Sequence, residues 1–398
     1  MTGQSGEMVR HVDDDERCAR LGVRHALAAP VADPLAAARA VTCLHATEPA
    51  SVHLAAWARA GASVADVDHA LYVDRSIVKQ LAMRRTVFAF PRELLPAVWG
   101  SASARVADQQ IRRMAKEMET TGIAADGTAW ADEHLGLLRR LIEHDGPLTT
   151  AEVRAALPAL DARVSRGKGR YQVDVAVAAS VVVTLAASGA VVRGENDGGW
   201  KISRPRWTSA AEWLGETPDP LPEAEGYAAL VAAWLRSFGP GTEADLVWWL
   251  GSTKAAVRAA LADLNAVPVE LDSGDTGYLL PGDDEPDAPV TPWAALLPTL
   301  DSTLMGWRQR DFYLDPDLTP YLFDSNGNGG TTAWLNGRVV GCWVQNTDGS
   351  VRVLPARPMT AAEGLLLNAE AERLTAFLNG VRITNVYSSL MMKGESLR

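Results

Sequence analysis

The 398-residue chain has only three cysteines, Cys18, Cys43 and Cys342, and no Cys-x-x-Cys pair. An odd, widely spaced set of cysteines excludes a disulfide-built scaffold and disfavours a structural zinc site. The remaining composition, with 47% hydrophobic and 22% charged residues, is that of an ordinary globular protein. Disordered and collagen-like classes are therefore excluded, and the length favours about two to four domains.

We expect neither a secretory signal nor a membrane-spanning segment. The first 20 residues are polar and carry the acidic run 13–16, unlike a signal peptide. The uncharged stretch 175–192 is only just long enough to cross a bilayer, and it contains Ser180, Thr184, Ser188 and Gly189. We interpret this stretch as a buried helix followed by a strand, and we expect a cytoplasmic protein.

Common signatures of catalysis and nucleotide binding are absent as well. The sequence has no GxGxxG, Walker loop, GxSxG or HExxH. Its seven histidines all lie in the first 144 residues, and none pairs with a cysteine at metal-ligand spacing. We therefore expect no metal and no other cofactor.

Charge is distributed unevenly behind the formal net value of −11. Residues 207–300 hold 15 acidic and three basic side chains, so the rest of the chain is close to neutral. Two basic segments stand out: residues 75–116 have nine basic against two acidic side chains, and residues 163–206 have eight against three. Such segments are either solvated helix faces or a one-sided field that attracts a polyanion. The acidic bulk charge predicts weak non-specific binding to DNA.

A short internal repeat indicates how the chain is organised. Residues 146–153 (GPLTTAEV) and 239–246 (GPGTEADL) both place Gly-Pro before a threonine N-cap. Glu152 completes a capping box with Thr149, and Asp245 takes the same place after Thr242. Each unit continues with a second predicted helix, at 172–187 and 253–264, and then with two short strands, at 190–193 and 200–202 or at 267–271 and 277–280.

Helix, helix and two-stranded wing is the winged-helix order. A less regular N-terminal copy is predicted from a helix that starts at 63–66, a second helix over 74–83 and a strand at 86–90. The alternative is that this order is simply a common local packing unit. Proline-rich joints at 217–222 and 281–289 separate the repeats, and strands flank Asn336-Gly337 and Asp348-Gly349 before a helix at 361–378.

We therefore predict an α+β protein, predominantly helical, with three tandem winged-helix units and a C-terminal β-rich domain closed by a helix. The predicted segments are 1–135, which carries the candidate active site, 136–216, 222–288 and 289–398.

One polar pair stands out just before a predicted helix. His45 and Thr47 lie two residues apart, ahead of Pro49, which suits the first position of a helix. Thr47 can alternatively be a helix N-cap, and His45 a surface histidine.

Several separate stretches resemble one family, the AlkZ/YcaQ-type winged-helix DNA glycosylases of bacteria. They are VDRSIVKQLAMRRTVFAF (73–90), GPGTEADLVWWLG (239–251), LLPTLDSTLMGWRQRDFYL (296–314) and DSNGNGGTTAWLNGRVVGCWVQ (324–345). The Met83-Arg84-Arg85-Thr86 run is similar to the Met-Arg-x-Thr run of the family, and Arg75 is expected on a preceding helix. The resemblance implies tandem winged helices around a DNA channel and excision of alkylated bases, including bulky natural-product adducts and cross-links.

The resemblance also implies an active site at His45 and Thr47. The family carries Gln-x-Gln or Gln-x-Asp just before a helix of its first unit, and this chain has His45-Ala46-Thr47 at the matching place. A purine alkylated at N7 or N3 is cationic and already a good leaving group, so the enzyme must mainly place and deprotonate a water. A neutral histidine can accept that proton, and the Thr47 hydroxyl can hold the water.

The resemblance and the charge pattern together predict DNA-backbone contacts by cations that flank the candidate site and the second repeat. These are Arg75, Lys79, Arg84, Arg85, Arg163, Arg166, Lys168 and Arg170.

We expect a monofunctional DNA glycosylase for alkylated purines, acting as a monomer on double-stranded DNA in repair or self-resistance and associated with the nucleoid. A non-catalytic winged-helix regulator and a protein that sequesters the lesion or genotoxin are the alternatives. No heptad dimerisation segment supports a dimeric regulator.

Overall fold

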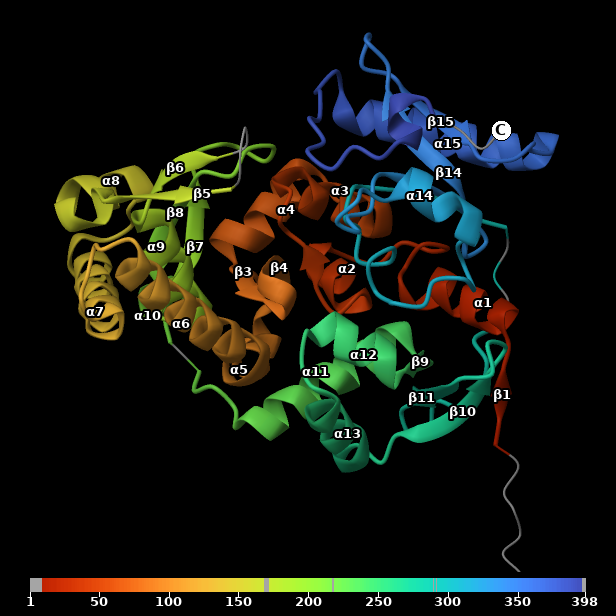
Figure 1. Ribbon diagram of the computed structural model, residues 1–398. Helices are drawn as coiled ribbons and strands as arrows, with labels where there is room; N and C mark the ends of the chain where they lie inside the picture. Colours follow the sequence, from red (N-terminus) through yellow and green to blue (C-terminus); the bar gives the residue numbers. More distant parts are fainter. Residues whose placement is uncertain (1–8, 168–171, 217, 289, 291, 396–398) are drawn as a thin grey trace, which may run out of the picture. The chain divides into compact units, whose positions relative to one another are not determined.

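The chain forms two compact units. The computed structural model describes residues 9–167, 172–216, 218–288, 290 and 292–395 (Figure 1). One unit combines the N-terminal residues through Val67 with residues 228 onward, and the other comprises Asp68–Tyr227. The chain therefore leaves the first unit inside helix α4 (Val64–Asp68) and returns to it inside α11 (Glu223–Phe238).

The first unit contains helices, two four-stranded sheets and, outside these sheets, the short strand β2. Its helices are α1 (Asp14–Arg24), α2 (Pro34–Ala40), α3 (Pro49–Ala60), α12 (Glu243–Leu250), α13 (Lys254–Asp263), α14 (Thr319–Leu322) and α15 (Ala361–Leu378). Its strands are β1 (His11–Val12), β2 (Leu44–His45), β9 (Gly241–Thr242), β10 (Val267–Leu271), β11 (Thr276–Leu279), β12 (Ala294–Leu297), β13 (Thr332–Leu335), β14 (Arg338–Gln345) and β15 (Val351–Pro355).

The wing of the 239–280 repeat is part of a larger sheet than the sequence predicts. The sheet order is β1-β10-β11-β9, in which β10 and β11 form the expected antiparallel hairpin. The N-terminal strand β1 joins β10 in parallel, and Val12 packs with Val269, Leu271 and Leu279. The strand β1 therefore covers an edge of the wing that would otherwise expose unpaired backbone groups.

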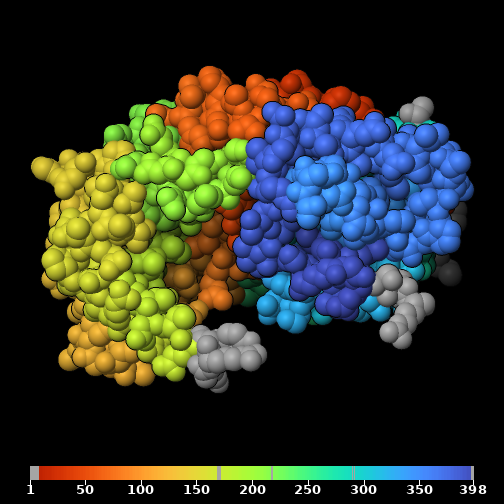
Figure 2. All heavy atoms as spheres, turned by 90° about the horizontal axis from the view of Figure 1, so that it is seen from above, coloured from red at the N-terminus to blue at the C-terminus, as the bar shows by residue number. Residues whose placement is uncertain are grey.

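The C-terminal part of the first unit matches its prediction. Strands β12 to β15 form one antiparallel sheet, and α15, which packs on β12 and β15, spans the predicted helix of residues 361–378. Asn336 and Gly337 both have positive φ, which a two-residue hairpin turn requires. In Figure 2, α15 and the neighbouring C-terminal residues, drawn in blue, form a continuous surface of this unit.

The second unit is helical with three small hairpins. Its helices are α5 (Leu95–Val98), α6 (Ala104–Thr120), α7 (Gly127–Asp145), α8 (Thr150–Ala156), α9 (Ala178–Ala187) and α10 (Ala210–Leu214), with π-helical turns at His69–Val73 and Trp99–Ser103. Its strands are β3 (Ile77–Ala82), β4 (Thr86–Pro91), β5 (Arg163–Arg166), β6 (Val173–Ala176), β7 (Val191–Asn196) and β8 (Pro205–Ser209).

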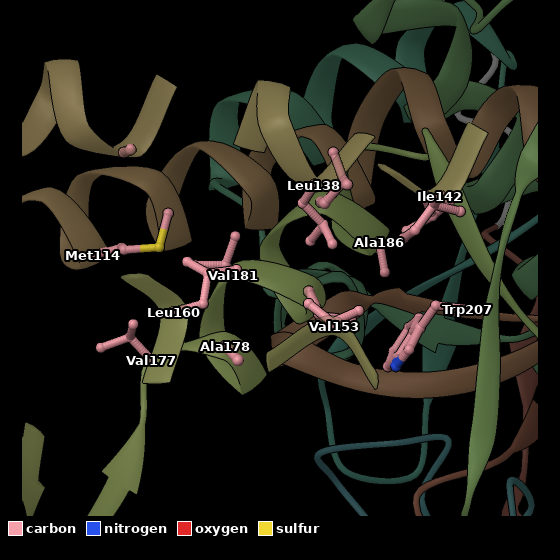
Figure 3. Packing of buried hydrophobic residues seen from close by; sticks show 14 of the residues in the cluster. Met114, Leu138, Ile142, Val153, Leu160, Val177, Ala178, Val181, Ala186 and Trp207 are labelled. Carbon is pink, nitrogen blue, oxygen red and sulfur yellow. The ribbon is translucent and has the colours of Figure 1, made fainter. Parts of the chain in front are cut away.

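The core of the second unit lies where α6, α7 and α9 pack together. Met114, Leu138 and Val181 belong to this cluster, and Trp207 of β8 also packs into it (Figure 3). The Trp207 indole N–H donates to the Thr150 hydroxyl at 3.1 Å, so the one polar atom of this ring is satisfied. The uncharged stretch 175–192 supplies α9 and the start of β7, as predicted. Among the described residues, no helix combines the length and the apolar character that crossing a membrane needs.

Both predicted capping boxes are confirmed. Thr149 and Glu152 exchange side-chain and backbone hydrogen bonds at the start of α8, and Thr242 and Asp245 do the same at the start of α12. Each box needs only residues three apart, which is why the sequence reveals it.

The helix predicted over residues 74–83 is wrong. Residues Ile77–Ala82 form strand β3, which pairs with β4 from Ile77 opposite Pro91 to Ala82 opposite Thr86. The two strands meet at Arg84 and Arg85, which both have positive φ, and Arg75 also has positive φ and lies outside any helix. The hydrophobic pattern of this short stretch is compatible with a helix or a strand, and the stretch forms a strand because it pairs with β4.

Two element boundaries in the first repeat also differ from their predictions. The helix predicted from residue 172 begins at Ala178, because residues 173–176 pair with β5 as strand β6. The strand predicted at 200–202 is instead β8 at Pro205–Ser209, which pairs with β7. The N-terminal copy therefore lacks its predicted second helix, whereas helix, helix and hairpin follow one another in the 239–280 repeat.

A polar strip at residues 299–303 holds α3 in the first unit. Asp301 makes a bidentate ion pair with Arg59 of α3, at 2.9 and 2.7 Å, and both side chains are fully buried. Arg59 also donates to the Thr303 hydroxyl, which in turn contacts buried His25. Breaking one partner of such a pair leaves an uncompensated buried charge.

We expect Arg59→Met or Asp301→Asn alone to lower the free energy of unfolding by about 3–5 kcal/mol. The double variant should cost clearly less than the sum of the two, because it buries no unpaired charge. Urea unfolding of the four proteins measures this coupling. Additive effects would show that the pair is not energetically linked.

Candidate active site

The start of α3 places the predicted catalytic pair. Residues Leu44–His45 form the buried strand β2, and Pro49 occupies the first turn of α3. The N-cap of α3 is Glu48 and not Thr47, because Glu48 is the residue with extended backbone directly before the helix. Thr47 is therefore not held as a cap, and its side chain is exposed.

His45 lies just behind Thr47. The imidazole is buried, with 5% of its surface exposed, and the backbone N–H of Thr47 points to its Nδ1 at 3.5 Å. This distance is at the long limit of a hydrogen bond, so a water can compete for Nδ1. A neutral imidazole that accepts at Nδ1 carries its proton on Nε2, which leaves the basic lone pair on the side of Thr47.

The structure adds Glu48, a residue to which the sequence analysis gives no role. Its side chain is only 5% exposed, and its Oε1 accepts from the backbone N–H of Val386 at 2.8 Å. Burial raises the pKa of the Glu48 carboxyl, while hydrogen bonds from the backbone of Val386 and Tyr387 partly oppose that rise. The only local signal for such a residue was a carboxylate directly before the N1 proline.

The C-terminal segment around residue 386 borders this site. Ser51 of α3 donates to the Thr299 carbonyl at 2.7 Å, and the Thr299 hydroxyl is 3.1 Å from the Asn385 side-chain oxygen. Burial and the charge of Glu48 raise the pKa of the Tyr387 phenol, so it remains a neutral donor. The site therefore gathers an imidazole, a hydroxyl and a carboxyl at one end of α3.

The site shows no arrangement of metal ligands. Within the described residues, no three His, Cys, Asp or Glu side chains are grouped as a metal ion would require. The chemistry open to His45, Thr47 and Glu48 is proton transfer, hydrogen bonding and charge stabilisation.

The predicted cations near the β3–β4 hairpin belong to the second unit and differ in their surroundings. Arg75 is committed to Trp213: its Nη1 donates to the Trp213 carbonyl at 2.6 Å, and its guanidinium lies 4.1 Å from the indole centroid. Lys79 donates to the Tyr72 hydroxyl at 3.0 Å. Arg84 is half-buried and Arg85 is exposed at the hairpin turn.

The cations predicted around the second repeat lie mostly on the β5–β6 hairpin. Arg163 is exposed and donates to the Asp174 carbonyl at 3.2 Å. Arg166 is held by Glu117 through two hydrogen bonds, at 2.9 and 2.6 Å. Lys168 and Arg170 lie outside the described residues.

A cleft of about 520 Å³ in the first unit lies away from these residues. Asp15, Asp311, Asp315 and Glu363 line it, and its arginines Arg338 and Arg357 already pair with Asp15 and Glu363. Its wall is therefore acidic, which does not suit a DNA phosphate. None of the predicted site residues lines this cleft.

Substituting Glu48 tests whether burial raises the pKa of its carboxyl in the folded protein. Its pKa in the folded state is raised, so ionisation increasingly penalises folding as pH rises above the ordinary value of 4.5. We expect the melting temperature of Glu48→Gln, relative to that of the wild type, to rise as the pH increases from 4.5 to 7.5.

Glu363→Gln is the matched control with the opposite sign. Arg357 and the Thr360 backbone N–H lower the pKa of Glu363 to about 2, so its carboxylate stabilises the fold at neutral pH. The melting temperature of Glu363→Gln should fall furthest below that of the wild type at pH 7.5. A pH-independent difference for Glu48→Gln would contradict the assignment.

Comparison with known proteins identifies the family and agrees with the fold. The family model described as "DNA glycosylase AlkZ-like" matches residues 38–377, which is most of the chain. The solved structure of the Streptomyces sahachiroi DNA glycosylase AlkZ is similar, with a TM-score of 0.71 and 17% sequence identity, over 91% of this chain and 96% of that one. At this identity the structural likeness bears on the fold alone. The comparison with curated proteins gives no match. The resemblance drawn from the sequence motifs is confirmed, and the chain belongs to the AlkZ-like DNA glycosylase family.

Proposed function

We propose that this glycosylase hydrolyses the N-glycosidic bond of purines alkylated at N7 of guanine or N3 of adenine in double-stranded DNA. His45 is the base that deprotonates the water, and Thr47 holds that water. The proposal includes bulky adducts, action as a monomer in repair or self-resistance, and no cofactor.

The observation that carries the proposal is the placement of His45 directly behind exposed Thr47 at the start of α3. The backbone N–H of Thr47 lies 3.5 Å from Nδ1 of His45, so this nitrogen faces Thr47. In the proposed mechanism, a water held by the Thr47 hydroxyl reaches Nδ1 in place of this long contact.

Hydrolysis of the N-glycosidic bond requires only a water molecule and a base, which is His45 in this proposal. The water oxygen forms a bond to the anomeric carbon of the sugar as the bond from that carbon to the purine breaks. The electron pair of the broken bond goes to the purine and neutralises its positive charge. The water proton goes to Nδ1 of His45, and the products are an abasic sugar and the free alkylated base. The carboxyl of Glu48 gives the site a negative charge that would favour positive charge on the sugar.

Contacts to the DNA backbone are proposed for the predicted cations of the second unit. Arg85 and Arg163 are exposed, although Arg163 also donates to the Asp174 carbonyl, and Arg75 and Arg166 are half-buried and held by protein partners. We also retain the interpretation of the two Gly-Pro-x-Thr repeats as winged helices that contact the duplex. Contacts of this kind position the protein without selecting a sequence.

We expect His45→Ala to slow excision by roughly 10²–10⁴-fold, because a general base contributes about that much. Single-turnover excision from a duplex with one N7-alkylguanine, followed by alkaline cleavage and electrophoresis, measures it. His45→Gln separates water positioning from proton transfer. Its amide can orient water but cannot take the proton, so this variant should retain only the part of the rate that water positioning supplies.

Three outcomes would change the proposed function. Excision by His45→Ala at the wild-type rate would remove His45 from the mechanism. Tight binding of the lesion without excision by the wild type would favour a sequestering protein. Neither excision nor lesion-selective binding would favour a non-catalytic DNA-binding protein.

We expect Thr47→Val to lower the single-turnover rate by roughly tenfold, because it removes one neutral hydrogen bond without changing side-chain volume much. Thr47→Ser keeps the hydroxyl and should retain most activity. Equal rates for the valine and serine variants would show that the hydroxyl takes no part.

A further inference from the structure

Two cations share a niche in the second unit without an ion-pair partner of their own. Lys79 lies on β3 and Arg193 on β7, and these strands pack against each other. Both side chains are half-buried. Arg166 and Arg206 of the same unit, in contrast, pair with carboxylates.

Arg193 is held in place by an aromatic ring. Its cross-strand partner is Trp207, and the guanidinium carbon lies 4.7 Å from the centroid of the indole. Trp207 is itself fixed in the hydrophobic core and by its bond to Thr150. Among the described residues, Arg193 has neither a hydrogen-bond acceptor nor a carboxylate partner, so all its N–H donors remain available.

Lys79 is positioned in a similar way by Tyr72. Its ammonium donates to the Tyr72 hydroxyl at 3.0 Å and lies 5.3 Å from the ring centroid. The Tyr72 oxygen accepts this bond, so its own O–H can donate outward. Burial raises the pKa of the Tyr72 phenol, which keeps that proton in place. The niche therefore offers an ammonium, a guanidinium and a hydroxyl donor.

The electrostatics of the niche favour an anion. Burial, and then the charge of Arg193, lower the pKa of Lys79 to about 8, and the carboxylate of Asp68 opposes this with a smaller effect. Burial also lowers the pKa of Arg193 to about 10. Both groups are still mainly protonated at pH 7, so two poorly hydrated cations stand together at a cost that a bound anion would relieve.

We propose that Lys79, Arg193 and Tyr72 form an oxyanion site that binds one backbone phosphate of the DNA. The sequence analysis included Lys79 among the DNA contacts but gave no role to Arg193 or Tyr72. The inference rests on the proposed function for its choice of ligand, because a phosphodiester is the oxyanion that a DNA substrate presents. Free inorganic phosphate shares this chemistry.

Salt-dependent DNA binding tests the niche. Each lost phosphate contact should reduce the slope of log K against log salt by about one. We expect that reduction, with several-fold weaker binding to an undamaged duplex, for Arg193→Gln and for Lys79→Gln. Arg193→Lys keeps the charge and should keep the slope. Arg139→Gln is the control for losing one positive charge, because Arg139 is exposed on α7 and pairs with Glu143.

Chemical labelling of the wild-type protein provides a test that needs no variant to fold. Undamaged duplex DNA should protect Lys79, but not exposed Lys116 of α6, from acylation at pH 8, read by mass spectrometry. Protection by DNA, with or without protection by inorganic phosphate, would support the proposal. Protection by inorganic phosphate alone would contradict binding of a DNA phosphate and indicate a site for a small oxyanion. No protection by either, or unchanged slopes in well-folded Arg193→Gln and Lys79→Gln, would overturn the proposal.

The niche and the glycosylase activity can fail separately. Normal excision by the wild type together with an unchanged slope for Arg193→Gln would remove the niche and leave the proposed function intact. A reduced slope for Arg193→Gln in a protein that excises nothing would support the niche and contradict the proposed function.

Discussion

The buried ion pair between Arg59 and Asp301 is the constraint on which the candidate active site depends. It fixes the last turn of α3 to the polar strip 299–303, while Ser51 bonds to Thr299 nearer the start of the same helix. Ser302 of the strip also donates to the Cys43 carbonyl at 2.7 Å, two residues before His45. One short buried segment therefore holds both the helix and the chain that leads into it. Removing an Arg–Asp pair from water costs free energy. The attraction between the two charges offsets this cost only when the geometry is good and additional hydrogen bonds satisfy the remaining polar atoms.

The chemistry at the start of α3 follows from side chains with different exposure. Thr47 reaches solvent, whereas His45 and Glu48 are covered. A covered imidazole keeps a defined orientation, and burial raises the pKa of the Glu48 carboxyl. Compared with a glutamine amide, an imidazole can accept a proton but offers fewer hydrogen-bond donors. In the proposed mechanism, His45 therefore contributes basicity and holds the water less well than an amide would.

The cations of the second unit do not all have the same kind of partner. Some of its arginines pair with a carboxylate, as Arg166 does, and others donate to a backbone carbonyl, as Arg75 does. In the Lys79–Arg193 niche, two cations without such partners are oriented on aromatic rings. The cations of the basic segments therefore differ in their surroundings.

The sequence by itself determined the features whose partners lie close along the chain. The capping boxes of Thr149 and Thr242, the turn at Asn336-Gly337 and helix α15 each depend on a few neighbouring residues, and the family motifs identified the family. Tertiary structure decided the rest. Residues 77–82 became a strand because β4 pairs with them, Glu48 became a buried carboxyl because a backbone N–H 338 residues away binds it, and Lys79 met Arg193 because β3 packs on β7. Local patterns carry no information about such distant partners, because burial and pairing arise only when the whole unit is assembled.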